Sequence, residues 1–221
     1  YGTSIDQDGD AKNETALVTR YRTMAQQPEC ERAIDDVINE AIVFDSDEPP
    51  VSIVLDNVEM PEQIRDAIRE EFDEMIGMLH FKTKAYDIFR NWYVDGRLYY
   101  HLMIDTANPR TGIQEIRFID PRKIKKVRSE KKRSQSNVQP NGQFIPKEYN
   151  EYFIYSEKGV SAGNQGVKIA PDSVAYCHSG ILDENNKMVR SHLHKAIKPM
   201  NQLRMLEDAT VIYRLARAPE R

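Results

Sequence analysis

The sequence predicts an α+β fold, with N-terminal helices, then a small and mostly antiparallel sheet, then one long helix at the end of the chain. Three observations support this fold class. Apolar residues recur at three- and four-residue steps as far as residue 94, which is typical of helices with one buried face. From Leu98 they alternate with period two, which indicates strands, and after Pro199 the helical period returns. Strands and helices do not alternate, so the pattern does not favour a parallel α/β sheet.

Three helices are expected before the sheet. Pro28 suits the first position of a helix, where its missing N–H costs nothing. Pro61 opens a second helix, and a third covers 82–94 and stops at the turn dipeptide Asp95-Gly96. Each helix carries one apolar stripe. The stripes are Ile34, Val37, Ile38, Ala41 and Ile42, then Ile64, Ile68, Phe72, Met75, Ile76 and Leu79, then Ala85, Ile88, Phe89 and Trp92.

The strands follow from the alternating pattern. Residues 98–105 and 113–119 flank a turn segment and predict a hairpin, and 119–128 continues as an extended segment. Residues 129–143 lack periodicity and predict a loop or a disordered arm. Further strands are expected at 51–55, 150–156 and 172–178.

The last helix is apolar on more than one side. Ser191 stands where an N-cap would, a short helix reaches Pro199, and the long helix begins or kinks there. A helix on the surface of a globular protein needs only one apolar stripe. The apolar residues on a second side of this helix therefore predict a packing partner on each of its two flanks. A central helix in an ordinary globular core remains the alternative. The candidate packing residues are Leu203, Met205, Leu206, Ala209, Val211, Ile212, Tyr213 and Leu215.

Composition and motifs do not indicate an enzyme. The 221 residues carry a net charge of −4, which argues against a protein that binds nucleic acid over its whole surface. We find no phosphate-binding loop, no dinucleotide-binding glycine pattern, no zinc-protease motif and no nucleophile elbow. His192 and His194 would point apart on a helix, and the two cysteines, Cys30 and Cys177, are expected to be buried free thiols. We therefore expect no catalytic residue, no metal site and no cofactor.

One segment concentrates positive charge. Between residues 117 and 133 only Asp120 and Glu130 oppose the basic side chains. Such a cluster attracts phosphate, suits an acidic protein surface, or keeps a loop solvated, and the sequence leaves all three readings open. The candidate contact residues, for DNA or an acidic partner, are Arg117, Arg122, Lys123, Lys125, Lys126, Arg128, Lys131, Lys132 and Arg133.

Several segments together resemble the portal protein of contractile-tailed bacteriophages. The resemblance runs in the same order from about residue 20 to residue 221, with no match over 1–19 or 129–148. The segments are AIDDVINEAIVF (33–44), EEFDEMIGMLHF (70–81), FRNWYVDGRLYYH (89–101), IRFIDPRKIKKVR (116–128) and the terminal helix SHLHKAIKPMNQLRMLEDATVIYRLARAPER.

The resemblance implies a structural subunit of a dodecameric ring at the unique capsid vertex, through which double-stranded DNA is packaged and ejected. Implied partners are identical copies, the major capsid protein, the terminase motor, neck and tail adaptor proteins and the passing DNA. The implied location is the virion, after assembly in the cytoplasm of the bacterial host. A ring without catalytic activity and without a membrane span is expected.

The same resemblance implies a domain organisation. Residues 1–19 would be a flexible N-terminal segment, 20–190 the N-terminal part of the wing domain, and 191–221 the helix leading to the stem and clip. The remainder of the protein would follow Arg221. Two alternatives stay open: a soluble nucleic-acid-binding module that uses residues 117–133, and an enzyme fragment whose catalytic residues lie beyond Arg221.

Overall fold

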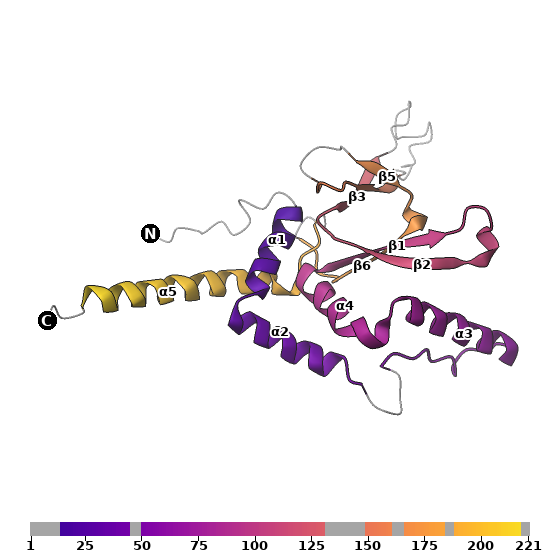
Figure 1. The fold of residues 1–221 in the computed structure, drawn as a ribbon, viewed down its shortest axis with the longest axis horizontal. Helices are drawn as coiled ribbons and strands as arrows, with labels where there is room; N and C mark the ends of the chain where they lie inside the picture. Colours follow the sequence, from indigo (N-terminus) through magenta and orange to yellow (C-terminus); the bar gives the residue numbers. More distant parts are fainter. Residues whose placement is uncertain (1–13, 45–49, 131–148, 161–165, 184–187, 218–221) are drawn as a thin grey trace, which may run out of the picture. The chain divides into compact units, whose positions relative to one another are not determined.

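The computed structural model describes residues 14–44, 50–130, 149–160, 166–183 and 188–217. The segment 1–13 and most of the loop expected over 129–143 lie outside these residues. The chain forms two compact units (Figure 1). We call residues 1–97 with 178–221 the helical unit, and residues 98–177 the sheet unit. The α+β class predicted from the sequence is confirmed.

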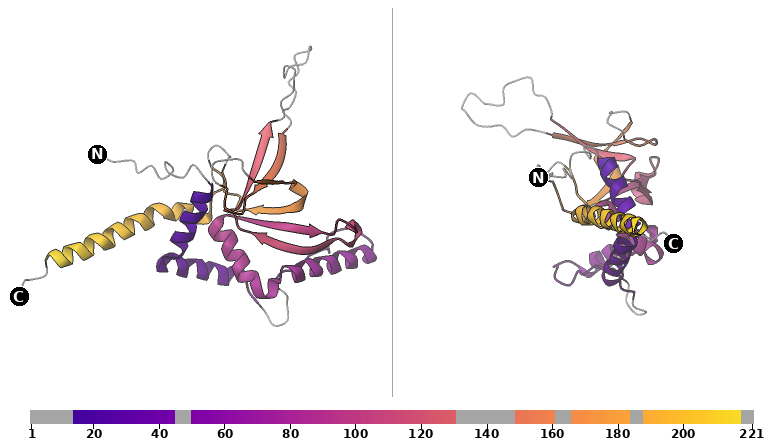
Figure 2. Two further views of the ribbon diagram at one scale, coloured as in Figure 1. Left: turned by 45° about the horizontal axis from the view of Figure 1, so that its top comes forward. Right: turned by 90° about the vertical axis from the view of Figure 1, so that its left-hand side faces the viewer.

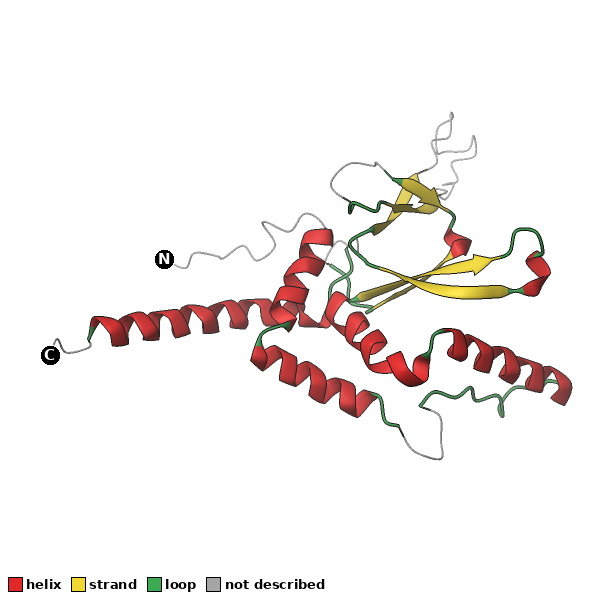
Figure 3. Ribbon diagram, viewed as in Figure 1, coloured by secondary structure: helices red, strands yellow, loops and turns green. Residues whose placement is uncertain are grey.

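The helical unit contains the five α-helices of the described chain (Figure 3). They are α1 (Glu14–Ala25), α2 (Pro28–Ala41), α3 (Glu62–Met78), α4 (Phe81–Asp95) and α5 (Ile197–Ala216), with the short helix η3 (His192–Ala196) before α5. Their shared core contains Leu17, Tyr21, Met24, Ala25, Cys30, Ile34, Ile38, Val94, Leu193 and Ile197. Helices α1, α2, α4 and the root of α5 therefore form one packed body.

Helix α1 was not predicted from the sequence. Its apolar positions are interrupted by threonine and arginine, so no clear stripe stands out. Tyr21 and Val18 are nevertheless fully buried, because α2, α4 and η3 surround this helix. Helix α1 also runs across residue 19, where the flexible segment was expected to end.

The predicted starts of α2 at Pro28 and of α3 after Pro61 are confirmed. Helix α4 ends at Asp95, and Gly96 follows in the left-handed region at φ 72°. A Cβ atom on Gly96 would lie 2.8 Å from the carbonyl oxygen of Arg190. Glycine is thus required here both by the backbone conformation and by the close approach of the segment that leads to α5.

The prediction of a strand at 51–55 is wrong. The segment forms no strand in the structure, although its β-branched composition favours one. Val54 is 70% exposed, and within the described part of the molecule no other strand pairs with residues 51–55. Without cross-strand partners, β-propensity alone does not stabilise a strand.

The sheet unit contains two three-stranded sheets in place of one meander (Figure 2). The first has the order β2-β1-β6, and the second β3-β4-β5. The strands are β1 (Arg97–Ile104), β2 (Ile113–Ile119), β3 (Ile124–Glu130), β4 (Tyr149–Tyr155), β5 (Val167–Ile169) and β6 (Val174–His178). The expected hairpin is confirmed as the antiparallel pair β1–β2, with Tyr99 opposite Ile119.

Both sheets contribute to one core. Tyr99, Ile119, Ile124, Phe153 and Val174 are buried together, and the rings of Tyr99 and Tyr176 stack at a centroid distance of 4.8 Å. Strand β5 was not predicted, because three residues are too few to show a period. It pairs with β4 and closes the second sheet.

Candidate functional site

Helix α5 presents its apolar residues to solvent. Every residue from 201 to 217 is exposed, and Leu215, Met205 and Ile212 are 72%, 67% and 66% exposed. Burying one such side chain fully stabilises a fold by about 1.5–3 kcal/mol, so a helix that leaves a row of them in water marks an interaction surface. The candidate packing residues therefore lie outside the core of the described chain, which excludes a central core helix within it. They are Leu203, Met205, Leu206, Ala209, Val211, Ile212, Tyr213 and Leu215.

The exposed residues of α5 lie on two sides of the helix. At 100° per residue, Met205, Leu206, Ala209, Ile212 and Tyr213 share one broad face, which we call the main face. Val211 and Leu215 lie on the opposite side, in line with Ile197 and Arg204 nearer the start of the helix. Two separate surfaces are thus available for contact.

The root of α5 is fixed to the helical unit by polar contacts from η3. The Ser191 hydroxyl accepts a hydrogen bond from the amide of Leu193 at 3.0 Å and donates one to the carbonyl of Tyr93 at 3.0 Å. This confirms Ser191 as the N-cap. On α1, the Tyr21 hydroxyl is hydrogen-bonded to Nδ1 of His194 at 2.7 Å. The direction in which α5 leaves the helical unit is therefore set by α1 and α4 together.

The two histidines of η3 have separate partners. The His192 ring stacks on Tyr93 at 4.9 Å with an interplanar angle of 6°, and it also contacts Trp92. Burial lowers the pKa of His192, because a charged imidazolium loses solvation between these rings. His194 instead faces Tyr21. Among the described residues no group of His, Cys, Asp and Glu has the arrangement of a metal site.

Two partly buried ion pairs join α1 to residues 95–97 at the end of α4. Asp95 is 1% exposed and accepts two hydrogen bonds from the Arg22 guanidinium, at 2.9 and 2.7 Å. The Arg97 side chain, also 1% exposed, pairs with Glu14 at 3.1 Å and donates to the carbonyl of Val189. Sequence reasoning missed both pairs, because the partners are far apart in the chain.

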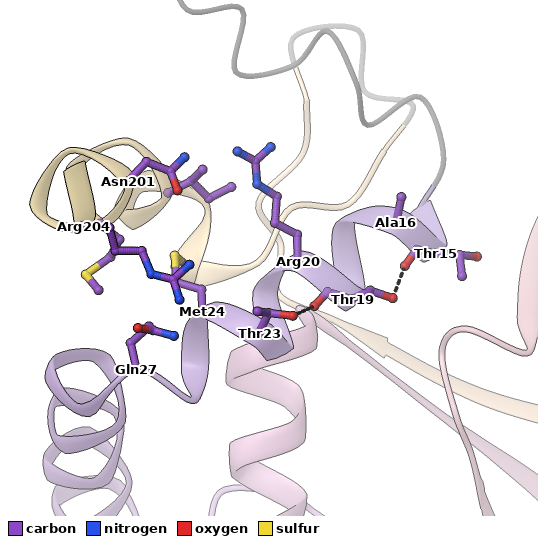
Figure 4. Close-up of a pocket in the computed structure, with 11 residues that line it drawn as sticks. Thr15, Ala16, Thr19, Arg20, Thr23, Met24, Gln27, Asn201 and Arg204 are labelled. Carbon is purple, nitrogen blue, oxygen red and sulfur yellow. Dashed lines mark hydrogen bonds between the residues drawn. The ribbon is translucent and has the colours of Figure 1, made fainter. Parts of the chain in front are cut away.

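A groove of about 570 Å³ lies between α1 and the first turns of α5 (Figure 4). We call it the root groove. Met24, Ile197 and Met200 supply its apolar part. Arg20 and Arg204 bring two guanidinium groups to it from the two helices, and no Asp or Glu is among the described residues that line it. The remaining lining residues are Thr15, Ala16, Thr19, Thr23, Gln27 and Asn201.

In the described part of the basic segment, several cations are paired with carboxylates of the same chain. Arg117 pairs with Glu115 at 2.9 Å, and Arg122 pairs with Asp120 at 2.8 Å. On β4, one carboxylate serves two basic side chains of β3, because Glu151 lies 2.8 Å from Lys126 and 3.6 Å from Arg128. The hydrogen bond from Lys126 lowers the pKa of Glu151. Four of the six candidate basic residues within the described part of the segment are therefore ion-paired.

Two further candidates lie in the described part of this segment, Lys123 and Lys125. Lys123 lines a groove of about 480 Å³ in the sheet unit, together with His101, Arg117 and Asp120. Lys125 is exposed on β3, on the face opposite to Lys126, since neighbouring strand residues point to opposite sides. The other three candidates, Lys131, Lys132 and Arg133, lie outside the described residues.

Within the part of the chain that the structure describes, no helix combines the length and the apolar composition needed to cross a bilayer. Cys30 is a buried free thiol, but Cys177 is exposed at the end of β6, so the expectation that both thiols are buried is wrong for Cys177.

Comparison with known proteins gives a consistent result. The family model described as "Bacteriophage T4-like portal protein (Gp20)" matches residues 14–221. The portal protein of Vibrio phage KVP40 is 38% identical over 216 residues, covering 93% of this chain and 41% of the relative. The portal protein of Salmonella phage ViI is 34% identical over 216 residues, covering 93% of this chain and 39% of the relative. The chain spans about two fifths of the length of these curated relatives.

Proposed function

Because the chain belongs to the bacteriophage T4-like portal protein family, we propose that it forms the N-terminal part of a structural subunit that assembles with identical copies into a closed ring. The exposure of apolar residues on two sides of α5 is the observation that carries this proposal. In a cyclic ring each subunit meets one neighbour on each flank through a head-to-tail interface. A helix with two unburied apolar sides has the surfaces that such an arrangement needs.

The whole protein would then form a dodecameric portal at the unique capsid vertex. Double-stranded DNA would pass through its channel during packaging and ejection. The terminase motor, the major capsid protein and the neck and tail adaptor proteins would bind around it. In the domain organisation expected above, residues 20–190 belong to the wing and 191–221 lead to the stem and clip. Such a ring acts as a conduit and an attachment point without catalysing a reaction, in the virion and after assembly in the host cytoplasm.

Electrostatics favours a conduit over a nucleic-acid-binding module. The net charge is −4, and most described basic residues of the segment 117–128 are already paired with carboxylates of the same chain. Tight binding of nucleic acid needs cations that are available to phosphate. DNA moves through a channel more readily when the protein surface does not bind its phosphates tightly.

Imaging the full-length protein by negative-stain electron microscopy tests the proposal. Rings of uniform subunit number are expected, and Leu206→Asp and Ile212→Asp should abolish them, because each would place an unpaired charge in a buried contact. Arg214→Asp introduces the same side chain on the polar side of α5 and is the matched control. A full-length protein that stays monomeric, or rings that form normally in both main-face variants, would contradict the proposal.

The alternative module makes a different prediction. Salt-dependent binding of isolated subunits to duplex DNA, lost when Lys123, Lys125, Lys126 and Lys131 are neutralised, would favour it. The ring proposal expects no such tight binding.

A further inference from the structure

The groove of about 480 Å³ in the sheet unit is lined by residues of both of its sheets. His101 comes from β1, Arg117 from β2, Tyr155 from β4 and Ile169 from β5, and Lys123 from the turn between β2 and β3. We call this cavity the sheet groove. Its volume lies in the range of about 300–1,000 Å³ that is usual for sites that bind small ligands. It is large enough for a short piece of a peptide.

The floor of the sheet groove is apolar. Ile119 is 8% exposed and belongs to the core of the sheet unit. Tyr155 and Ile169 pack against that core and are only partly buried, so part of each side chain is accessible from the groove. An apolar group of a ligand can therefore lie against Tyr155 and Ile169 without displacing a core residue.

Three hydrogen-bond donors that line the groove have no side-chain partner within the described part of the chain. They are the ammonium group of Lys123, the hydroxyl of Tyr155 and a ring N–H of His101. Lys123 is held in place through its backbone. Its amide donates to the carbonyl of Asp120 at 2.8 Å, and its carbonyl accepts from the amide of Ser156 at 2.8 Å. The donors are thus carried by ordered backbone at the groove.

The acidic residue of the groove already has its counter-charge. Among the described lining residues the single carboxylate is that of Asp120, which accepts hydrogen bonds from the Arg122 guanidinium at 2.8 Å and from the Arg122 amide at 2.9 Å. Arg117 stands opposite His101 in the β1–β2 ladder, so both side chains lie on one face. Its pair with Glu115 is solvent-exposed, and pairs of that kind are weak. The groove therefore favours an anion.

A protein segment fits this anion site better than nucleic acid does. Duplex DNA is bound tightly through about six to ten phosphate contacts, whereas the groove brings together only Arg117, Lys123 and His101. The apolar floor offers nothing to a sugar-phosphate backbone. A peptide, in contrast, can place a carboxylate and an apolar side chain side by side.

We propose that the sheet groove binds an acidic segment of a partner protein. A carboxylate of that segment accepts hydrogen bonds from Lys123, Tyr155 and His101, and a neighbouring apolar side chain lies against Ile169. Charge-assisted hydrogen bonds of this kind are among the stronger polar contacts in proteins. The inference rests on the proposed function, which gives the ring protein partners, and it names the chemistry by which one of them is recognised.

Titration of the full-length protein with labelled, capped peptides tests the site, with fluorescence anisotropy as the readout. The acidic probe has the sequence Glu-Ile-Glu-Phe-Glu, and its matched probe Gln-Ile-Gln-Phe-Gln has the same shape without the charges. We expect the acidic probe to bind about tenfold more tightly or better, because its carboxylates meet unpartnered donors. A third probe, Glu-Ser-Glu-Ser-Glu, keeps the charges and should bind more weakly than the first, because it leaves the apolar floor uncovered.

Three variants locate the binding. Lys123→Glu should weaken binding of the acidic probe by about tenfold or more, and Tyr155→Phe by about three- to tenfold, while circular dichroism confirms folding. Lys125→Glu is the matched control. It makes the same charge change two residues away on β3, outside the lining of the groove. At physiological salt it should change the affinity by less than about twofold, because exposed charges are screened over about 8 Å.

The outcomes separate this inference from the proposed function. Equal affinity for the Glu and Gln probes, or equal losses in Lys123→Glu and Lys125→Glu, overturns the site. Tighter binding of a short DNA duplex than of the acidic probe, lost in Lys123→Glu alone, overturns the protein partner in favour of phosphate. Electron microscopy of the same preparations tests the ring independently. Rings without selective peptide binding leave the proposed function intact, and selective peptide binding by a protein that forms no rings contradicts the proposed function and leaves the site.

Discussion

Replacing Arg22 by Ala is expected to destabilise the helical unit by about 3 kcal/mol. Asp95 is 1% exposed and accepts two charge-assisted hydrogen bonds from Arg22, at 2.9 and 2.7 Å. Removing one partner of a buried ion pair costs about 3–5 kcal/mol, because the remaining charge stays buried without it. Since the Arg22 side chain is 28% exposed, water already weakens this pair, and the lower end of that range applies.

Asp95→Ala should cost less, about 1.5–2 kcal/mol, because the Arg22 guanidinium can then turn towards solvent while no carboxylate remains buried. The ratio of the two losses of stability tests the argument more sharply than either value alone, because Arg22→Ala should destabilise the helical unit more than Asp95→Ala. It follows from the unequal burial of the two partners and not from the strength of their contact.

Urea unfolding of the 221-residue chain measures both effects. Trp92 is its single tryptophan and lies one turn before Asp95 on α4, so its fluorescence reports on this junction. With a slope of about 2–3 kcal/mol per molar urea, a loss of about 3 kcal/mol lowers the midpoint by about 1 M. Asp56→Ala is the control, because its pair with Arg69 is exposed and worth about 0–1 kcal/mol. Should Arg22→Ala unfold no earlier than Asp56→Ala, the assignment of this pair as a stabilising contact is wrong.

Three further predictions concern the same two units. Gly96→Ala should lower the stability of the helical unit by about 2 kcal/mol or more in the same urea assay, because the added Cβ meets the Arg190 carbonyl at a positive φ; an unchanged midpoint would refute the close approach. The pKa of His192 in the folded chain is lowered from 6.5, so the unfolded chain binds the proton more readily. The contribution of His192 to the free energy of unfolding should therefore be complete above about pH 6.5 and decrease as the pH falls below it. His192→Phe should flatten that pH dependence of stability, and an identical pH profile in both proteins would contradict the prediction. Lys126→Met should change the stability of the sheet unit by less than about 1 kcal/mol and leave a smaller salt dependence, since both partners of its pair with Glu151 are well exposed; a loss of several kcal/mol would show that this pair is not a surface contact.

Local signals in the sequence predicted much of the fold. Pro28 and Pro61 marked two helix starts, Asp95-Gly96 marked the end of α4, and the alternation from Leu98 marked the first hairpin. These signals act over a few residues, through fixed proline geometry, glycine at positive φ and side-chain periodicity. The order of matching segments along the chain similarly indicated the portal family, which the comparisons show.

Other features depended on residues far apart in the chain. Helix α1 is held by burial of Tyr21 against His194, and the segment 51–55 has strand composition but no strand partner. The basic segment 117–133 was read as one charged cluster, yet Glu115 and Glu151 neutralise much of its described part.

The sequence by itself thus determined where α2 and α3 begin, where α4 ends, and which residues of α5 are apolar on two sides. Only the tertiary structure decided that these residues remain in water and that Arg22 and Arg97 form ion pairs between α1 and residues 95–97. The physical reason is that turns and periodicity are properties of neighbouring residues. Burial and charge pairing arise only when distant segments are brought together.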